Sequence, residues 1–351
     1  MPIDSEVPAV RSLTLLFVLS LLSAGLPAFA DAERPALKVF ASVLPVQTFV
    51  DAVGGERVDT EVMVRPGHSP ATYDPSPKQV AALAEADLYV RVGVPFENAW
   101  MKRIQAANPG MPILDLRDGL PLRTLEAHDH DDEPQTDHGH GHAHGHGHAH
   151  GHGHAHGHGH DEAHAHADQD AEAMDPHVWT SPPLVREMAI AIRDRLSQLD
   201  PEGAAIYARN QQAFDAELQA LHATLEARLA DLDRRTFLVY HPAWGYFADA
   251  YDLEQIPIER AGKEPGPRRL SALIEQAQAT GAQAIFVQPE FDQRIAEQVA
   301  RAIGGRVESA TPLAADYAAN LRRFANVLVD ANRSASAAPS HSPSNRSTPA
   351  P

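Results

Sequence analysis

The feature that most constrains the fold of this chain of 351 residues is an alternation of strand-like and helix-like segments, which occurs in two blocks. Short apolar runs rich in β-branched residues predict strands, and apolar residues at three- and four-residue spacing predict helices. The first block predicts strands at 37–43, 58–64, 88–92 and 112–116, and helices at 46–53, 79–86 and 96–107. The second predicts strands at 236–240, 253–258, 284–288 and 305–308, and helices at 244–251, 269–280, 293–303 and 316–331. Because strands that alternate with helices form mostly parallel sheets, we expect an α/β fold with two lobes.

Two further helices are predicted between the blocks, at 182–199 and from about 200 to 232. Ser181 and Asp200 each precede a proline and match the start of a helix. At a rise of about 1.5 Å per residue, the second helix would be roughly 45–50 Å long. That length fits one rigid helix that joins the two lobes.

A histidine-rich segment interrupts the first block. Sixteen of the 21 histidines lie between His128 and His166, where they alternate with Gly or Ala. Such a segment buries too little apolar surface to offset its chain entropy, so we expect disorder in this insert and in the Ser/Pro/Ala-rich C-terminal tail. The predicted organisation is an N-terminal lobe at 36–181 with the insert at 127–172, connecting helices at 182–232, a C-terminal lobe at 233–331 and a tail at 332–351.

The insert itself is predicted to bind metal weakly and at several places, because its imidazoles are close together and carboxylates flank them. A solvated spacer without a metal role is the alternative. The predicted auxiliary ligands are His138, His140, His142, His144, His146, His148, His150, His152, His154, His156, His158 and His160.

The N-terminal residues predict export. An apolar run at 13–22 is followed by Ala28 and Ala30, the small residues that a signal peptidase reads, so we expect a signal peptide at 1–30. The run is shorter than the ~20 residues of a membrane-spanning helix. With no Cys in the chain to carry a lipid, we expect a soluble periplasmic protein after cleavage, acting as a monomer. The net charge of −18 disfavours nucleic acid as a partner and is compatible with cations.

Three histidines lie in loops where the predicted elements would bring a ligand site. His68 and His241 follow predicted strands, and His177 precedes a predicted helix. Ligands of open α/β sheets bind beyond the carboxyl ends of the strands, and imidazole nitrogens suit tetrahedral Zn²⁺. Taken singly, each of these histidines is better explained as a loop or capping residue. Their number and positions together favour a metal site, but spacing alone leaves the question open.

Four motifs carry a family resemblance: Asp-Pro-His-Val-Trp at 175–179, His-Pro-Ala-Trp-Gly-Tyr-Phe at 241–247, Tyr-Asp-Pro-Ser-Pro at 73–77 and Pro-Leu-Ala at 312–314. From residue 36 to 331, outside the insert, the chain resembles the zinc- and manganese-binding solute-binding proteins of ABC importers. The resemblance implies two α/β lobes joined by a long rigid helix, with metal held in the cleft between the lobes.

The resemblance also implies ligand positions. His177 and His241 fall on two of them, and zinc binders carry His where many manganese binders carry Glu at the position of His241. The usual first ligand position holds Ala71 here, so we assign that role to His68, three residues upstream.

The usual fourth ligand position holds Thr311. A water molecule or one of three carboxylates could take its place, and the candidates are Glu290, Glu264 and Glu259.

These features together predict a protein that captures Zn²⁺ in the periplasm with high affinity and delivers it to the membrane permease of an ABC importer. The alternatives are uptake of Mn²⁺ or Fe²⁺, and a periplasmic zinc buffer without a transporter. A zinc hydrolase would share a three-histidine shell, but the sequence has no His-Glu-x-x-His motif. We therefore expect no enzymatic activity.

Overall fold

The computed structural model describes residues 35–125, 174–260 and 262–336. All the helices and strands described below lie in the unit Leu37–Pro351. The predicted signal peptide, the predicted insert with its auxiliary histidines and most of the predicted tail lie outside the described residues.

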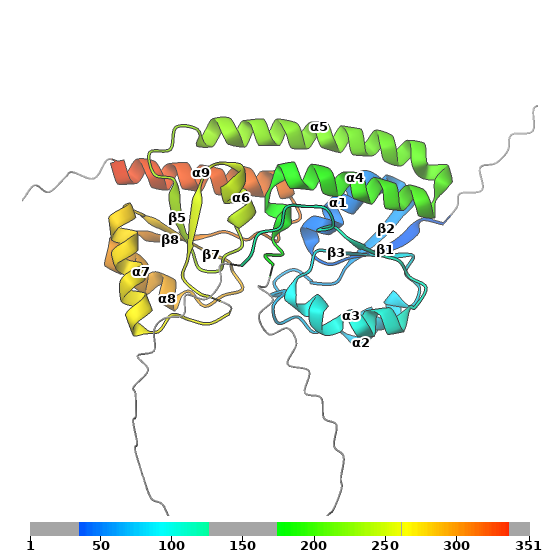
Figure 1. The fold of residues 1–351 in the computed structure, drawn as a ribbon, viewed down its shortest axis with the longest axis horizontal. Helices are drawn as coiled ribbons and strands as arrows, with labels where there is room; N and C mark the ends of the chain where they lie inside the picture. Colours follow the sequence, from blue (N-terminus) through cyan, green and yellow to red (C-terminus); the bar gives the residue numbers. More distant parts are fainter. Residues whose placement is uncertain (1–34, 126–173, 261, 337–351) are drawn as a thin grey trace, which may run out of the picture. The chain divides into compact units, whose positions relative to one another are not determined.

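The first block of the sequence forms a four-stranded sheet in which every pair of neighbours is parallel. Its strands, in the spatial order β2-β1-β3-β4, are β1 (Leu37–Ala41), β2 (Val58–Val62), β3 (Leu88–Arg91) and β4 (Ile113–Asp115). The intervening helices are α1 (Leu44–Gly54), α2 (Pro77–Leu83) and α3 (Pro95–Ala107). Figure 1 shows α2 and α3 on one side of this sheet and α1 on the other.

The second block forms a second parallel sheet in the equivalent order β6-β5-β7-β8. Its strands are β5 (Thr236–Val239), β6 (Glu254–Pro257), β7 (Ala284–Val287) and β8 (Arg306–Ser309), and its helices are α6 (Gly245–Ala250), α7 (Pro267–Thr280) and α8 (Arg294–Ile303). Side chains alternate across β5, because Phe237 and Val239 pack towards α6 and α9 (Tyr317–Ser336), whereas Leu238 packs with α7 and α8. Both sheets confirm the predicted α/β class.

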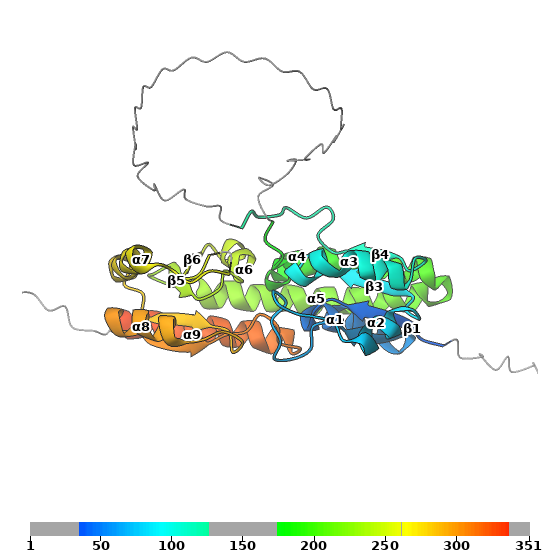
Figure 2. The same ribbon diagram turned by 90° about the horizontal axis from the view of Figure 1, so that it is seen from below.

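Three helices lie outside this strand–helix alternation: α4 (Pro182–Leu199), α5 (Ala204–Leu229) and α9. Helix α5 packs against α1 of the first block, against α4 and against α9, as Figures 1 and 2 show. Its buried side chains recur at three- and four-residue spacing from Tyr207 to Leu229. One continuous hydrophobic cluster therefore runs from the first sheet through α5 to α6 and α9.

Two predicted boundaries are corrected. Helix α5 has 26 residues, or about 39 Å, and is shorter than predicted because Pro201–Gly203 forms a separate 3₁₀ turn before it. The predicted tail begins too early, because α9 continues to Ser336. Within that extension, Asn332 donates from Nδ2 to the carbonyl of Arg234 at 2.9 Å and so ties the helix end to the start of the second sheet.

The two described ends that flank the histidine-rich insert lie next to each other. Thr124 and Met174 form an isolated antiparallel bridge, and the backbone N–H of Asp175 donates to the carbonyl of Arg123 at 2.8 Å. The residues on either side of the insert are therefore held together by backbone contacts. Among the described helices, none is long and apolar enough to cross a membrane.

Candidate metal centre

His241 lies just beyond the carboxyl end of β5, next to the central strand β7. Its Nδ1 is 2.6 Å from Oε1 of Glu259, a carboxylate that is only 2% exposed and follows β6. The nearby carboxylate favours the tautomer in which Nδ1–H donates, which leaves the Nε2 lone pair available for a metal. Burial lowers the pKa of His241 against the raising effect of Glu259, and the neutral imidazole is the form that binds metal.

His177 has the same kind of partner on a different element. It lies directly before the 3₁₀ turn Val178–Thr180, and its Nδ1 is 2.7 Å from Oδ1 of Asp175. The same oxygen accepts from the backbone N–H of His177 at 2.9 Å. Because His177 is 8% exposed and Asp175 is 2% exposed, the ring is held in one orientation with Nε2 free.

The two imidazoles lie next to each other in an edge-to-face arrangement. Their ring centroids are 5.2 Å apart at an interplanar angle of 74°. Phe291 stacks on the His241 ring with centroids 5.3 Å apart, and Trp179 lies 5.2 Å from the His177 ring. The Trp179 indole is fixed in turn, since its Nε1–H donates to the carbonyl of Pro312 at 2.9 Å.

Both histidines line a cavity of about 80 Å³ whose wall is mostly apolar. Residues from both blocks of the sequence contribute to it. The lining residues are Ser69, Pro70, Ala71, Val94, Pro95, Leu125, Pro176, His177, Trp179, His241, Gln288, Glu290, Phe291, Pro312 and Leu313. An apolar wall lowers the local dielectric constant and so strengthens the interaction between a cation and the polar groups that line the cavity.

His68 is not brought to this cavity. Its side chain is exposed, its Nδ1 is 3.2 Å from the carbonyl of Pro66, and its ring edge lies against Tyr73 at 5.7 Å. Ala71, at the position where the resembling family carries its ligand, does line the cavity. Within the described ranges, no three His, Cys, Asp or Glu side chains are grouped closely enough to hold a metal ion.

The three candidate carboxylates differ in their surroundings. Glu290 is half-buried and lines the cavity. Glu259 is engaged with His241, so its place in the structure favours orienting that ring over binding metal directly. Glu264 is exposed. Thr311 is occupied in its own turn, where its Oγ1 accepts from the backbone N–H of Leu313 at 3.1 Å.

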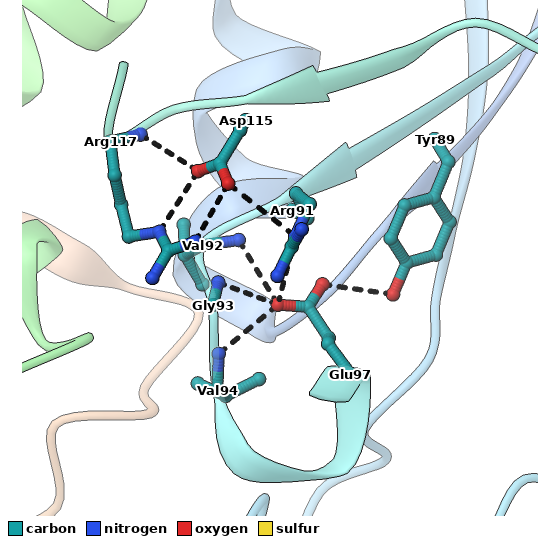
Figure 3. Close-up of polar contacts among 8 residues, drawn as sticks. All are labelled: Tyr89, Arg91, Val92, Gly93, Val94, Glu97, Asp115 and Arg117. Atoms are coloured by element: carbon teal, nitrogen blue, oxygen red, sulfur yellow. Dashed lines mark hydrogen bonds and ion pairs between the residues drawn. The ribbon is translucent and has the colours of Figure 1, made fainter. Parts of the chain in front are cut away.

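A buried carboxylate holds the loop that leads into α3, as Figure 3 shows. Glu97 is fully buried, and its Oε2 accepts from the backbone N–H groups of Val92, Gly93 and Val94 at 3.3, 2.6 and 3.1 Å. Its Oε1 accepts from the hydroxyl of Tyr89 at 3.0 Å. These bonds fix the loop that presents Val94 to the cavity. Burial raises the pKa of Glu97.

The loop held by Glu97 also contacts the segment around His68. The backbone N–H of Phe96 donates to the carbonyl of Pro70 at 3.1 Å. Gly93 has a φ of 78°, and a side chain at that position would collide with Arg117. Sequence reasoning missed Glu97 and Asp175 as supporting residues. An acidic residue two positions before a candidate ligand histidine was the available signal for Asp175.

With this geometry in place, comparison with known proteins gives one consistent result. The family model described as "Zinc-uptake complex component A periplasmic" (ZnuA) matches residues 39–331. The chain belongs to the ZnuA family. This ZnuA-family chain is 34% identical over 335 residues to the high-affinity zinc uptake system protein ZnuA of Paracoccus denitrificans, covering 92% of this chain and 98% of that protein. It is 38% identical over 292 residues to ZnuA of Haemophilus influenzae, covering 80% and 85%.

Solved ZnuA structures have the same fold. A crystal structure of ZnuA superposes with a TM-score of 0.70 at 34% identity, covering 85% of this chain and 99% of that one. A ZnuA deletion mutant with zinc bound gives a TM-score of 0.70 at 33% identity, covering 85% and 98%. The predicted family and the predicted parallel α/β fold of this ZnuA-family chain are therefore both confirmed.

Proposed function

We propose that this chain captures Zn²⁺ in the periplasm and delivers it to the permease of an ABC importer. The observation that carries the proposal is the pair of adjacent imidazoles, His177 and His241, each with its Nδ1 hydrogen-bonded to a buried carboxylate. That arrangement leaves two Nε2 atoms for one ion. The relatives named for high-affinity zinc uptake support zinc as the cargo.

Imidazole ligands favour Zn²⁺ over Mn²⁺, which prefers carboxylate and carbonyl oxygen. Zn²⁺ usually takes four ligands, so two positions remain beyond the histidine pair. Glu290 is a candidate for one of these two ligand positions, because it lines the same cavity. His68 stays a prediction that requires its loop to rearrange when metal binds. A water molecule would complete the shell.

We further propose that the chain has no catalytic role, that residues 1–30 are removed on export and that the histidine-rich insert binds metal weakly. The ZnuA family consists of uptake components, which supports a carrier over a hydrolase.

Competition titration tests the cargo. The full chain, stripped of metal, is titrated with Zn²⁺ and then with Mn²⁺ against a chromophoric chelator of known affinity. We expect one tight Zn²⁺ site per chain, with Mn²⁺ at least ~100-fold weaker, a difference of about 2.8 kcal/mol. Tighter binding of Mn²⁺ would contradict the zinc assignment.

Delivery is tested separately. Loaded protein is added to vesicles that contain the zinc ABC permease of the same organism, and zinc entry is followed with an internal dye. A buffer without a transporter would bind zinc equally well and would support no entry.

A further inference from the structure

One polar side chain at the cavity has no role in the site described above. Gln288 lies directly beyond β7, as His241 lies beyond β5. The parallel register pairs Val239 with Phe286, and the backbone N–H of Tyr240 donates to the carbonyl of Phe286 at 2.8 Å. Continuing that register places Gln288 beside His241, at the ~4.8 Å spacing of neighbouring strands.

The carboxamide oxygen of Gln288 is buried and has no hydrogen-bond donor among the described residues. The residue is 6% exposed, yet within the described part of the chain its Oε1 accepts no hydrogen bond. Buried carboxamide oxygens elsewhere in the fold are bonded. Gln79 accepts from the hydroxyl of Tyr73 at 2.9 Å, and Gln255 accepts from the backbone N–H of Trp244 at 3.1 Å.

An unbonded buried acceptor destabilises a protein unless something compensates it. Gln288 lines the same cavity as the two histidines, so a cation held by their Nε2 atoms would supply that compensation. Gln288 also lies close to Glu290, the candidate carboxylate ligand that lines the cavity. The backbone N–H of Phe291, the residue after Glu290, donates to the carbonyl of Gln288 at 3.1 Å.

We propose that the side-chain oxygen of Gln288 is a ligand of the metal cargo, beside His177 and His241. The inference rests on the proposed function and deepens it. A carboxamide oxygen is neutral, so it holds a dication less strongly than a carboxylate does. A shell of two imidazoles and one neutral oxygen suits a carrier that must later release its ion to a partner.

Three variants of the full chain test this. Gln288→Met keeps the volume and removes the oxygen, Gln288→Glu keeps an oxygen and adds charge, and Gln211→Met is the matched control. Gln211 is also 6% exposed, but it lies on α5 and does not line the cavity. Zn²⁺ and Mn²⁺ affinities are measured by chelator competition with one equivalent of metal, and the melting temperature of the metal-free protein is measured in parallel.

We expect Gln288→Met to weaken Zn²⁺ binding at least tenfold without lowering the melting temperature of the metal-free protein, because an unsatisfied acceptor is removed. Gln288→Glu should bind Zn²⁺ at least as tightly as the parent and should gain more affinity for Mn²⁺, which favours carboxylate. The control should leave Zn²⁺ affinity unchanged.

Two results would overturn the inference alone: a Gln288→Met protein that binds Zn²⁺ within twofold of the parent, or one that loses affinity and metal-free stability together. A parent chain without a tight Zn²⁺ site would instead overturn the proposed function, and this inference with it.

Discussion

The histidine pair and the segment around His68 differ in what holds their side chains. His177 and His241 are each bonded through Nδ1 to a carboxylate that is itself almost fully buried. His68 is exposed, and its Nδ1 contacts only a carbonyl two residues away. The comparison teaches that a candidate ligand histidine in this fold is distinguished less by its place after a strand than by a second residue that fixes its tautomer and orientation.

The largest expected effects separate the three histidines. His177→Ala or His241→Ala should weaken Zn²⁺ binding at least ~100-fold, about 2.8 kcal/mol, because each removes a preoriented ligand. His68→Ala should cost no more than about tenfold, or ~1.4 kcal/mol, since the segment must rearrange before this ring can reach the metal. Isothermal titration with one equivalent of Zn²⁺ measures all three.

Two further variants sharpen that test. Ala71→His in the His68→Ala background should restore or improve affinity, because Ala71 already lines the cavity. His222→Ala is the control, as His222 lies on α5 with its Nδ1 3.2 Å from the hydroxyl of Tyr251. If His68→Ala lost as much Zn²⁺ affinity as His241→Ala, the distinction between the preoriented histidine pair and the exposed His68 would be wrong.

Substitution of the carboxylate partners should cause the next-largest loss of Zn²⁺ affinity. Asp175→Asn and Glu259→Gln keep the side-chain shape but let the amide donate to Nδ1, which favours the tautomer with hydrogen on Nε2. Replacing such partners typically lowers metal affinity 10–100-fold. Glu254→Gln, an exposed position on β6 that does not line the cavity, is the matched control. Should Glu259→Gln and Glu254→Gln bind Zn²⁺ equally well, the orienting role of Glu259 would be wrong.

Lowering the pH should weaken Zn²⁺ binding, because the ligand imidazoles become protonated. A ligand histidine at the reference pKa of ~6.5 loses about 25-fold in affinity between pH 7 and pH 5, because protons compete with metal. Burial lowers the pKa of His241, so its protonation begins at lower pH and its share of this loss is smaller. Titrations at pH 5, 6 and 7 should therefore show the tight site declining less steeply than the weak sites predicted for 127–172. Flat binding in both would exclude histidine as the main ligand.

The smallest change is expected from deleting the insert. His177 and His241 lie outside 127–172, and the bridge between Thr124 and Met174 already brings the two ends together. Calorimetry on the deleted chain should show one tight Zn²⁺ site within about threefold of the parent, with the weak sites gone. If tight binding disappeared with the insert, the centre would not be at the histidine pair.

Much of the fold follows from the sequence alone. The pattern of apolar residues predicted the strands of both sheets and the helices between them. Strands and helices have different side-chain periods, and each period can be recognised within a short stretch of sequence. The motifs around His177 and His241 identified the two histidines that share the cavity. Errors at the fold level were confined to element ends, such as the start of α5 and the end of α9, where single turns and caps decide.

The composition of the site was decided only by the tertiary structure. His68 follows a strand, as His241 does, but strand order and loop conformation leave it exposed and bring Ala71 to the cavity instead. Gln288 carries no sequence signal as a site residue, and it lies beside His241 only because β5 and β7 are neighbours in the sheet. Sequence spacing records distance along the chain, whereas a metal site depends on which strand ends meet in space and on which buried polar atoms remain without a partner there.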